Sequence, residues 1–233
     1  MSKSFPNTGA TVIDSVSDLP AASADLEGVM VFQKDTNELK ICDGSGWVSV
    51  VDTDAPPGLE LISPTSVTNA TNTNGLITFS GVGEVMLDGL FSSKYVFYRM
   101  LFNMFTTNGT NTDINLRLRA NGVSNSGTSY YRQTLNVDNG TVSASRSLGT
   151  YAGFTWVSNN ASRGFCAMDI MDPATASPTF FIPLSINGYL GAYSSWYSIQ
   201  HNVSTSYDGF HFFPGAGLSV SGSVRVYGYR NSI

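Results

Sequence analysis

Apolar and polar residues alternate with a period of two along most of this chain. No stretch repeats its apolar residues at the helical period of 3.6 over more than about two turns, so the pattern predicts strands throughout. In the clearest example, residues 94–105, one face consists of Val96, Tyr98, Met100, Phe102 and Met104. The second face also carries Tyr95, Phe97 and Leu101, so we expect this strand to be central, or covered on that side by another subunit.

A second strand shows the alternation of a half-buried sheet. One face carries Ile114, Leu116 and Leu118, and the other carries Asn115, Arg117 and Arg119. We expect the apolar set to face a core and the polar set to face solvent. Further strands are predicted at residues 130–137, 141–146, 151–157, 164–171, 179–186, 192–201, 209–213 and 218–229.

Turn residues separate nearly all of these strands. Asn139 and Gly140 tolerate the positive φ of a tight primed turn, which predicts a hairpin at that point. Strands that recur about every 8 to 12 residues with such turns are typical of antiparallel sandwiches. The expected fold class is all-β: a small N-terminal hairpin or meander module, followed by an antiparallel, jelly-roll-like β-sandwich.

A domain boundary is visible at residues 51–58, where two prolines, a glycine and two aspartates interrupt the alternation. We predict an N-terminal module at residues 1–52, a linker at 53–58 and the sandwich at 59–233. Within the module, residues 28–50 read as two or three short strands with polar turns. So small a module buries little surface, so we expect it to pack on copies of itself or on another protein.

The composition narrows the functional classes. Charged residues make up 12% of the 233 residues, hydrophobic residues 42%, and the net charge is −5. These values argue against disorder, and the scattered Lys and Arg argue against nucleic-acid binding. No apolar run approaches the roughly 20 residues of a membrane helix, and the N-terminus lacks a signal-peptide pattern, so we expect synthesis in a cytoplasm and no membrane insertion. Cys42 and Cys166 lie in different predicted modules, and we expect both to be reduced.

The N-terminal module resembles the small β-hairpin modules of bacteriophage fibres and other virion proteins. The resemblance rests on Gly28, Phe32, Asp35-Thr36, Leu39, Asp43-Gly44 and Trp47. It implies attachment to the particle through other virion proteins. Phe32, Leu39 and Trp47 are therefore candidate attachment or assembly residues.

Residues 58–233 resemble the C-terminal β-sandwich of phage minor structural and fibre proteins. The matching segments are FSSKYVFYR at 91–99, LRLR at 116–119, YY at 130–131, YDGF at 207–210 and GSVRVYGYR at 222–230. The resemblance implies a location in the virion and a homotrimer. Tail fibre, head fibre and capsid decoration protein all stay open, because a fold alone does not determine function.

Few residues suit catalysis or metal binding. His201 and His211, with Asp208 between them, are a conceivable metal-ligating set, although their spacing matches no known site and structural roles explain them more simply. Asp169 and Asp172 are the close, inward-looking carboxylate pair that a glycan-cleaving enzyme would need, but Asp172 precedes a proline and suits a turn. No phosphate-binding loop or nucleophile elbow is present. We therefore expect no catalytic residues, no cofactor and no metal, and the metal question for the two histidines stays open.

Aromatic residues near turns are the candidate receptor contacts. Tyr189, Tyr193, Trp196 and Tyr197 lie in a stretch rich in Gly and Ser. Aromatic faces stack on sugar rings and polar side chains supply hydrogen bonds, so a host-surface glycan or protein is a candidate partner. The alternative is that these rings fill the core or a subunit interface, where aromatic residues dominate burial.

Together these features favour a non-enzymatic phage structural protein, a trimeric tail fibre component whose C-terminal domain binds the host surface. A head fibre or capsid decoration protein is the first alternative. A polysaccharide depolymerase that uses Asp169 or Asp172 is the less favoured one.

Overall fold

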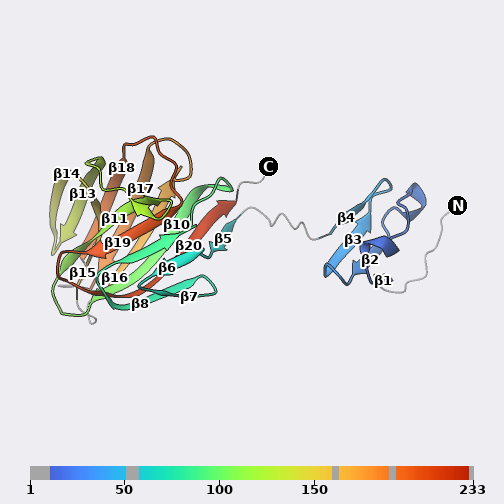
Figure 1. Ribbon diagram of the computed structural model, residues 1–233, viewed down its shortest axis with the longest axis horizontal. Helices are drawn as coiled ribbons and strands as arrows, with labels where there is room; N and C mark the ends of the chain where they lie inside the picture. The colour runs from blue at the N-terminus through green and yellow to red at the C-terminus, as the bar shows by residue number, and fades with distance from the viewer. Residues whose placement is uncertain (1–10, 51–57, 159–162, 189–192, 231–233) are drawn as a thin grey trace. The chain divides into compact units, whose positions relative to one another are not determined.

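The computed structural model describes residues 11–50, 58–158, 163–188 and 193–230 (Figure 1). The chain divides into two compact units, Met1–Pro56 and Pro57–Ile233. Regular structure in both is almost entirely β, and the strands of the second unit pair antiparallel in two sheets. The expected fold class, an all-β chain with an antiparallel β-sandwich, is confirmed. In the described ranges, no helix is long and apolar enough to cross a membrane.

The first unit is a four-stranded sheet in the order β1-β2-β3-β4. Its elements are β1 (Thr11–Ile13), η1 (Val16–Asp18), η2 (Ala24–Leu26), β2 (Met30–Gln33), β3 (Glu38–Cys42) and β4 (Trp47–Ser49). Strands β2, β3 and β4 form the expected antiparallel meander, and β1 adds to β2 in parallel, which the sequence pattern did not predict. Asp43 closes the second turn by accepting hydrogen bonds from the backbone N–H groups of Ser45 and Gly46.

The second unit contains a ten-stranded and a six-stranded sheet. Strands of the larger sheet are β5 (Leu59–Ile62), β7 (Thr71–Thr73), β8 (Leu76–Val82), β10 (Tyr95–Thr106), β13 (Tyr130–Asp138), β14 (Thr141–Gly149), β16 (Gly164–Met171), β17 (Thr179–Asn187), β18 (Tyr193–His201) and β20 (Val220–Arg230). Those of the smaller sheet are β6 (Ser66–Thr68), β9 (Val85–Asp88), β11 (Thr112–Ala120), β12 (Val123–Ser124), β15 (Ala152–Val157) and β19 (Gly209–Pro214).

The larger sheet has the order β14-β13-β18-β17-β16-β10-β20-β8-β7, and the smaller one has the order β12-β11-β19-β9-β6 with β15 also on β11. The chain passes repeatedly from one sheet to the other, as in β8 to β9 to β10 to β11. The last described strand, β20, lies inside the larger sheet (Figure 1). One of its edges pairs with β10, and the other pairs first with β8 and then with β5.

The hydrophobic core lies between the two sheets. Strand β10 supplies Tyr98, Met100, Phe102 and Met104, and β11 supplies Ile114, Leu116 and Leu118, all fully buried as expected. The Phe102 ring packs against Phe154 and Phe212, with ring centroids 5.0 and 5.5 Å apart. A register shift between Tyr95 and Tyr98 turns Tyr95 inward as well. The strict alternation had placed Tyr95 on the second face, so that assignment is wrong.

The predicted strands after residue 130 match observed strands to within a few residues. The β13–β14 hairpin turns at Asn139 and Gly140, whose φ values of 46° and 78° are those of the expected primed turn. Five further strands, β5 to β9, lie in residues 59–88, where the alternation predicted none.

Candidate functional site

The aromatic receptor candidates separate into different environments. Trp196 is 46% exposed on the outer side of β18, whereas Tyr197 is only 5% exposed and faces the core. Adjacent residues of a strand point to opposite faces, so Tyr197 cannot make the surface contact that was predicted for it. Tyr193 is half-buried against the ring of Trp156, with centroids 5.1 Å apart. Tyr189 lies outside the described residues.

Phe32 and Leu39, two of the attachment candidates, lie on one open face of the sheet in the first unit, whereas Trp47 is opposite Cys42 and so lies on the other face. Phe32 is directly opposite Leu39 in β3 and Val12 in β1, and Met30 is opposite Ile41. The opposite face of this sheet carries the buried apolar residues of the unit, which among those described are Ile13, Val31 and Cys42. Trp47 is half-buried, and its indole N–H donates to the carbonyl of Pro20 at 2.8 Å.

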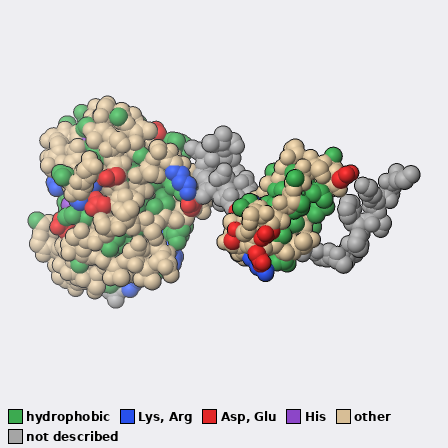
Figure 2. Space-filling model, turned by 45° about the vertical axis from the view of Figure 1, so that its right-hand side comes forward, with side chains coloured by type: hydrophobic (Ala, Val, Ile, Leu, Met, Phe, Trp, Pro, Cys, Tyr) green, Lys and Arg blue, Asp and Glu red, His purple; other side chains and the backbone are tan. Residues whose placement is uncertain are grey.

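This open face leaves several apolar side chains in contact with solvent. Val12, Met30, Val48 and Val50 are exposed, and Figure 2 shows hydrophobic side chains on the surface of this unit. A unit with so few buried apolar side chains gains little free energy from burial. The face therefore suits a contact with another protein surface, and the role of Phe32, Leu39 and Trp47 in attachment stays a prediction.

The histidines and Asp208 do not form a common site. His201 is buried in the core, with Nδ1 3.1 Å from the Ser129 hydroxyl and Nε2 2.6 Å from the Tyr207 hydroxyl. The carboxylate of Asp208 instead accepts from the backbone N–H of Asn121 at 3.3 Å. Across the described ranges, no three His, Cys, Asp or Glu groups lie close enough together to hold a metal ion.

Burial of His201 makes the protein sensitive to acid. Its pKa is lowered from 6.5 to about 4, because the charged imidazolium would lose its hydration. Between these pKa values the unfolded chain binds more protons than the folded one, so the free energy of unfolding falls as the pH drops. We expect a loss of about 3 kcal/mol between pH 7 and pH 4 from this group.

Denaturant unfolding at several pH values measures this effect. The variant His201→Gln should be less stable at pH 7 and should lose most of the additional acid sensitivity. A variant with the same pH slope as the unmodified protein would contradict the assignment to His201.

The candidate carboxylate pair is not a pair. Asp169 lies on the outer side of β16, where it accepts hydrogen bonds from Arg99 Nε and Nη2 at 2.8 and 2.7 Å. The expectation that it looks inward is wrong, because the inward positions of β16 are taken by Met168 and Ile170. Asp172 occupies the turn after β16 with a φ of 57°, which agrees with the turn interpretation.

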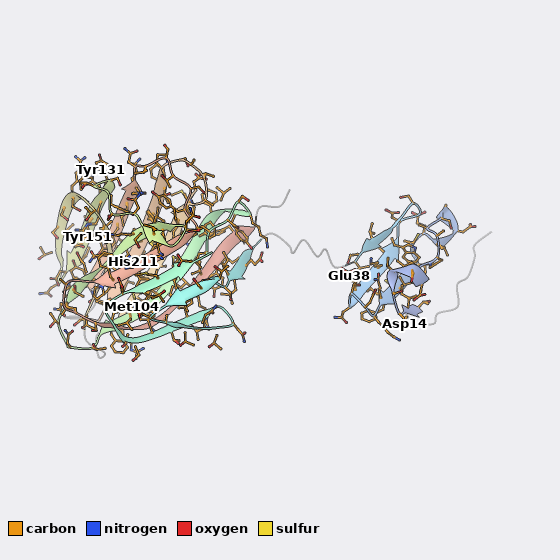
Figure 3. The ribbon with its side chains drawn as sticks, viewed as in Figure 1. Asp14, Glu38, Met104, Tyr131, Tyr151 and His211 are labelled. Carbon is orange, nitrogen blue, oxygen red and sulfur yellow. The ribbon has the colours of Figure 1, made fainter. Side chains whose placement is uncertain are left out.

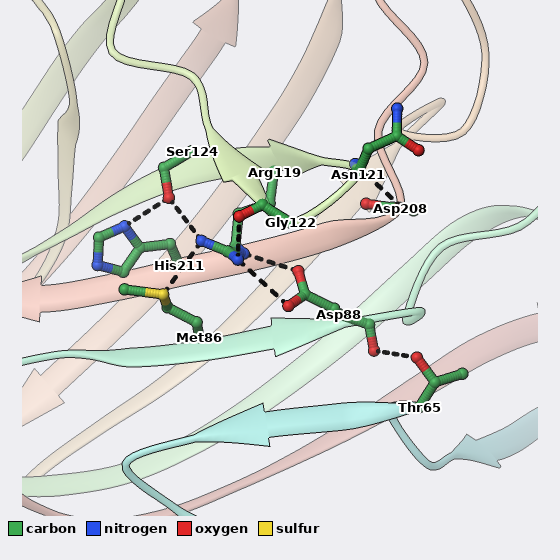
Figure 4. A network of polar contacts seen from close by, with 9 residues as sticks. All are labelled: Thr65, Met86, Asp88, Arg119, Asn121, Gly122, Ser124, Asp208 and His211. Atoms are coloured by element: carbon green, nitrogen blue, oxygen red, sulfur yellow. Dashed lines mark hydrogen bonds and ion pairs between the residues drawn. The ribbon is translucent and has the colours of Figure 1, made fainter.

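Arg119 lies on the outer side of the smaller sheet, on the face of β11 that was expected to be in contact with solvent. Arg119 Nε donates to the Asp88 carboxylate at 2.7 Å, and its other nitrogens bond to the Gly122 carbonyl and the Ser124 hydroxyl (Figure 4). Arg119 is only 5% exposed, so its expected exposure to solvent is wrong.

The ion pair of Arg119 spans an intervening strand. Strand β19 lies between β11 and β9, and its Gly209 is directly opposite Arg119. A Cβ atom on Gly209 would lie 2.8 Å from the Asp88 carboxylate oxygen and 3.1 Å from the Arg119 Cβ. Because Gly209 has no side chain, it leaves the space through which the Arg119 side chain crosses β19 to reach Asp88.

The outer side of the ten-stranded sheet forms a broad apolar surface. We call its exposed and half-buried apolar side chains the outer apolar face. They are Phe97, Leu101, Leu135, Phe165, Ala167, Phe180, Ile182, Leu184, Ile186 and Trp196. The strand register aligns one row of it across five strands: Leu101, Ala167, Leu184, Trp196 and Leu135 are successive cross-strand partners. The Arg99–Asp169 ion pair lies in the next row, where the two charges balance.

The margin of this sheet is also uncovered. Strand β14 is the edge strand beyond β13, and its residues are exposed on both faces over almost all of its length. Its only charged side chain is Arg146. Natural proteins usually protect such edges with charges, prolines or covering segments, so a nine-residue edge with a single charge is suited to a contact with another chain.

The outer side of the smaller sheet contains a hollow that combines charged and aromatic side chains. We name it the Arg117 hollow: its volume is about 590 Å³, and Glu84, Asn115, Arg117, Tyr151, His211 and Phe213 are among its lining residues. A second hollow of about 600 Å³ adjoins it and shares Asn115 and Tyr151. Figure 3 labels Tyr151 and His211 on the unit that carries both hollows.

Arg117 is held firmly in this hollow. Its Nε donates to the carbonyl of Thr150 at 3.0 Å. Its guanidinium carbon lies 5.1 Å from the centroid of Phe213 and 5.8 Å from that of Tyr151, whose rings contact each other edge to face. Aromatic faces attract a guanidinium group and fix its plane.

His211 forms the other wall of the hollow. Its Nδ1 is 3.0 Å from the Ser124 hydroxyl and its Nε2 is 3.2 Å from Glu84. Burial lowers the pKa of His211 most, the cations Arg117 and Arg119 lower it further, and Glu84 opposes them. His211 is therefore held neutral at ordinary pH, and Arg117 is the permanent positive charge of the hollow.

Sequence reasoning missed the Arg117 hollow. Asn115 and Arg117 were recognised as the polar face of one strand, but Tyr151, His211 and Phe213 come from other parts of the chain. Only the pairing of β11 with β15 and β19 brings these residues together. No local motif marks the site.

Comparisons with known proteins add little. No family model matches the sequence, and no curated protein matches it. Among solved structures, the SPRY domain of human HERC1 is similar at 12% sequence identity, covering 68% of this chain and 99% of that domain, with a TM-score of 0.25. Similarity at this level carries no argument about function.

Proposed function

We propose that this protein is a non-enzymatic structural component of a phage particle, a tail fibre protein that assembles from three copies of the chain. The outer apolar face is the observation that carries the proposal. The sequence resemblance supports the location in the virion and the number of copies.

The size of the face supports an assembly role. Five strands about 4.8 Å apart and four residue rows about 6.7 Å apart give a surface of about 400 Å². The largest apolar patch on a typical monomer is about 300–600 Å² and is often functional. Because the side chains project from the sheet, the area that they bury in a contact would be larger than this projected area. It would approach the value for a standard interface, which is about 800 Å² per partner.

A second copy of the chain is the partner that fits best. The one ion pair within the outer apolar face is internally neutral, and the exposed Arg225, opposite Leu101 in β20, lies at the margin of the face, so the centre of the face carries no net charge. The adjoining edge strand β14 offers unpaired backbone groups to the same neighbour. The first unit has its own open apolar face, and we assign the attachment to another virion protein to that face.

Charge placed on the outer apolar face should break the assembly. In Leu184→Lys, each copy would bring a cation into the centre of the contact, where it would be buried without a partner. Light scattering should give about three times 24.9 kDa for the unmodified protein and 24.9 kDa for this variant.

The matched control is Val123→Lys, because Val123 is 70% exposed on the other sheet. This variant should keep the mass of the unmodified protein. A monomeric unmodified protein, or an unchanged mass in Leu184→Lys, would contradict assembly through this face. Antibody labelling of particles in the electron microscope would then distinguish a tail fibre from a head fibre or a capsid decoration protein.

A further inference from the structure

The Arg117 hollow is separate from the proposed assembly face, because the two lie on the outer sides of different sheets. Its volume of about 590 Å³ is in the range of small-molecule sites, which is about 300–1,000 Å³. It therefore has room for a ligand in the assembled protein.

Arg117 presents a fork for a planar anion. The bond from Nε to Thr150 and the rings of Tyr151 and Phe213 fix the guanidinium. Its two terminal nitrogens make no hydrogen bond to any residue in the described parts of the chain. A guanidinium group that is held in one plane is suited to bind a carboxylate through two parallel hydrogen bonds.

Asn115 adds a neutral polar group to the floor. Asn115 is only 6% exposed and lines both adjoining hollows. Within the described ranges its side-chain amide has no hydrogen-bond partner, so its donors and its acceptor are available to a ligand in the hollow. An amide can donate to one hydroxyl group and accept from another, which is the pairing that a sugar offers.

Tyr151 supplies a platform at the rim. It is 46% exposed, so part of its ring faces solvent beside the guanidinium of Arg117. An exposed aromatic ring can bury the apolar face of a sugar ring and so gain free energy from the removal of surface from water.

We propose that the Arg117 hollow binds a sugar that carries a carboxylate, such as a uronic acid unit of an acidic polysaccharide. The carboxylate pairs with Arg117, the hydroxyl groups pair with Asn115, and the ring stacks on Tyr151. The proposed role is binding alone; of the nearby carboxylates, Glu84 lies 3.2 Å from His211, and Asp113 of the adjoining hollow lies 3.2 Å from Arg132. This inference deepens the host-contact role of the proposed fibre protein, but it rests on a different surface from the assembly.

A ligand-observed NMR titration of the full chain tests the proposal. The probes are sodium D-glucuronate, D-glucose as its neutral counterpart, and sodium acetate as the carboxylate alone. We expect glucuronate to bind about tenfold more tightly than either glucose or acetate. Equal affinities for glucuronate and glucose, or no binding of glucuronate, would overturn the proposal.

Three variants locate the site. Arg117→Gln should weaken glucuronate binding by about tenfold and leave glucose binding unchanged, because it removes the charged fork but keeps a polar side chain. Tyr151→Ala should weaken both sugars and leave acetate unchanged. Arg225→Gln removes an arginine from the exposed side of β20 and should bind like the unmodified protein.

The solution mass and thermal unfolding of each sample are measured alongside the titration. Loss of binding in Arg117→Gln with unchanged mass and melting temperature would support a ligand site that is independent of assembly. Undiminished glucuronate binding by Arg117→Gln would overturn the proposed site, whether or not the protein assembles.

Discussion

Replacement of Gly222 with alanine should cost more than about 4 kcal/mol of the free energy of unfolding, a value found only when a substitution breaks a special structural feature. Gly222 lies in β20 directly opposite Met104 of β10, with a φ of 152° that L side chains rarely adopt. A Cβ atom there would overlap the carbonyl oxygen of Asn103 and would come within 2.9 Å of the Met104 Cα. Both atoms belong to backbone in the centre of a sheet, so neither can move aside alone.

Urea unfolding followed by circular dichroism measures this cost. Gly217→Ala is the matched control, because Gly217 also has a positive φ, of 75°, but has no atom within 4 Å of the added Cβ. We expect about 1 kcal/mol for the control, from backbone strain alone. Similar losses in the two variants would contradict a steric role for the close approach of β10 to β20.

Arg119→Met is the second large effect that we expect, with a loss of about 3–5 kcal/mol, because it leaves the Asp88 carboxylate partly buried without its cation. In this variant Asp88 stays in the same partly buried position. The Gly122 carbonyl and the Ser124 hydroxyl also lose the N–H donors of the arginine. Methionine matches the length of the arginine stem, so the change removes charge and hydrogen bonds more than volume.

A double-mutant cycle with Asp88→Leu separates the ion pair from the packing. Removal of both charges should be less costly than Arg119→Met alone, since no buried charge is then left unpaired. Additive losses in the double variant would show that the pair contributes nothing through its charges. Thermal unfolding of the four proteins at one pH and ionic strength is sufficient for the comparison.

The strands that could be predicted from the sequence are those whose alternation continues over many residues. Strand β10 has twelve residues with an unbroken apolar face, and β13, β16 and β17 alternate over eight or nine. Strands β6 and β7 have three residues each, Ser-Val-Thr and Thr-Asn-Thr, which is too short for a periodic signal. They form because β9 and β8 offer them partners, and this pairing is a property of the tertiary fold.

The residues whose burial was wrongly predicted are buried for local reasons that an alternation with a period of two cannot show. Tyr95 turns inward because the register between β10 and β20 shifts beside it. Arg119 is buried because Gly209, a residue 90 positions later, leaves room for its contact with Asp88. The Arg117 hollow likewise depends on β11, β15 and β19 lying side by side.

The position of β20 has a consequence for synthesis of the protein on the ribosome. This strand joins β10 to β8 and β5, so the centre of the ten-stranded sheet is complete only when residues 220–230 are present. Contacts between segments so distant along the chain form slowly, because the loops that they close are long. A nascent chain therefore cannot complete this sheet until residues 220–230 have left the ribosomal exit tunnel. Chains that terminate before residue 220 would lack this strand, so β10 and β8 would each be left with an unpaired edge.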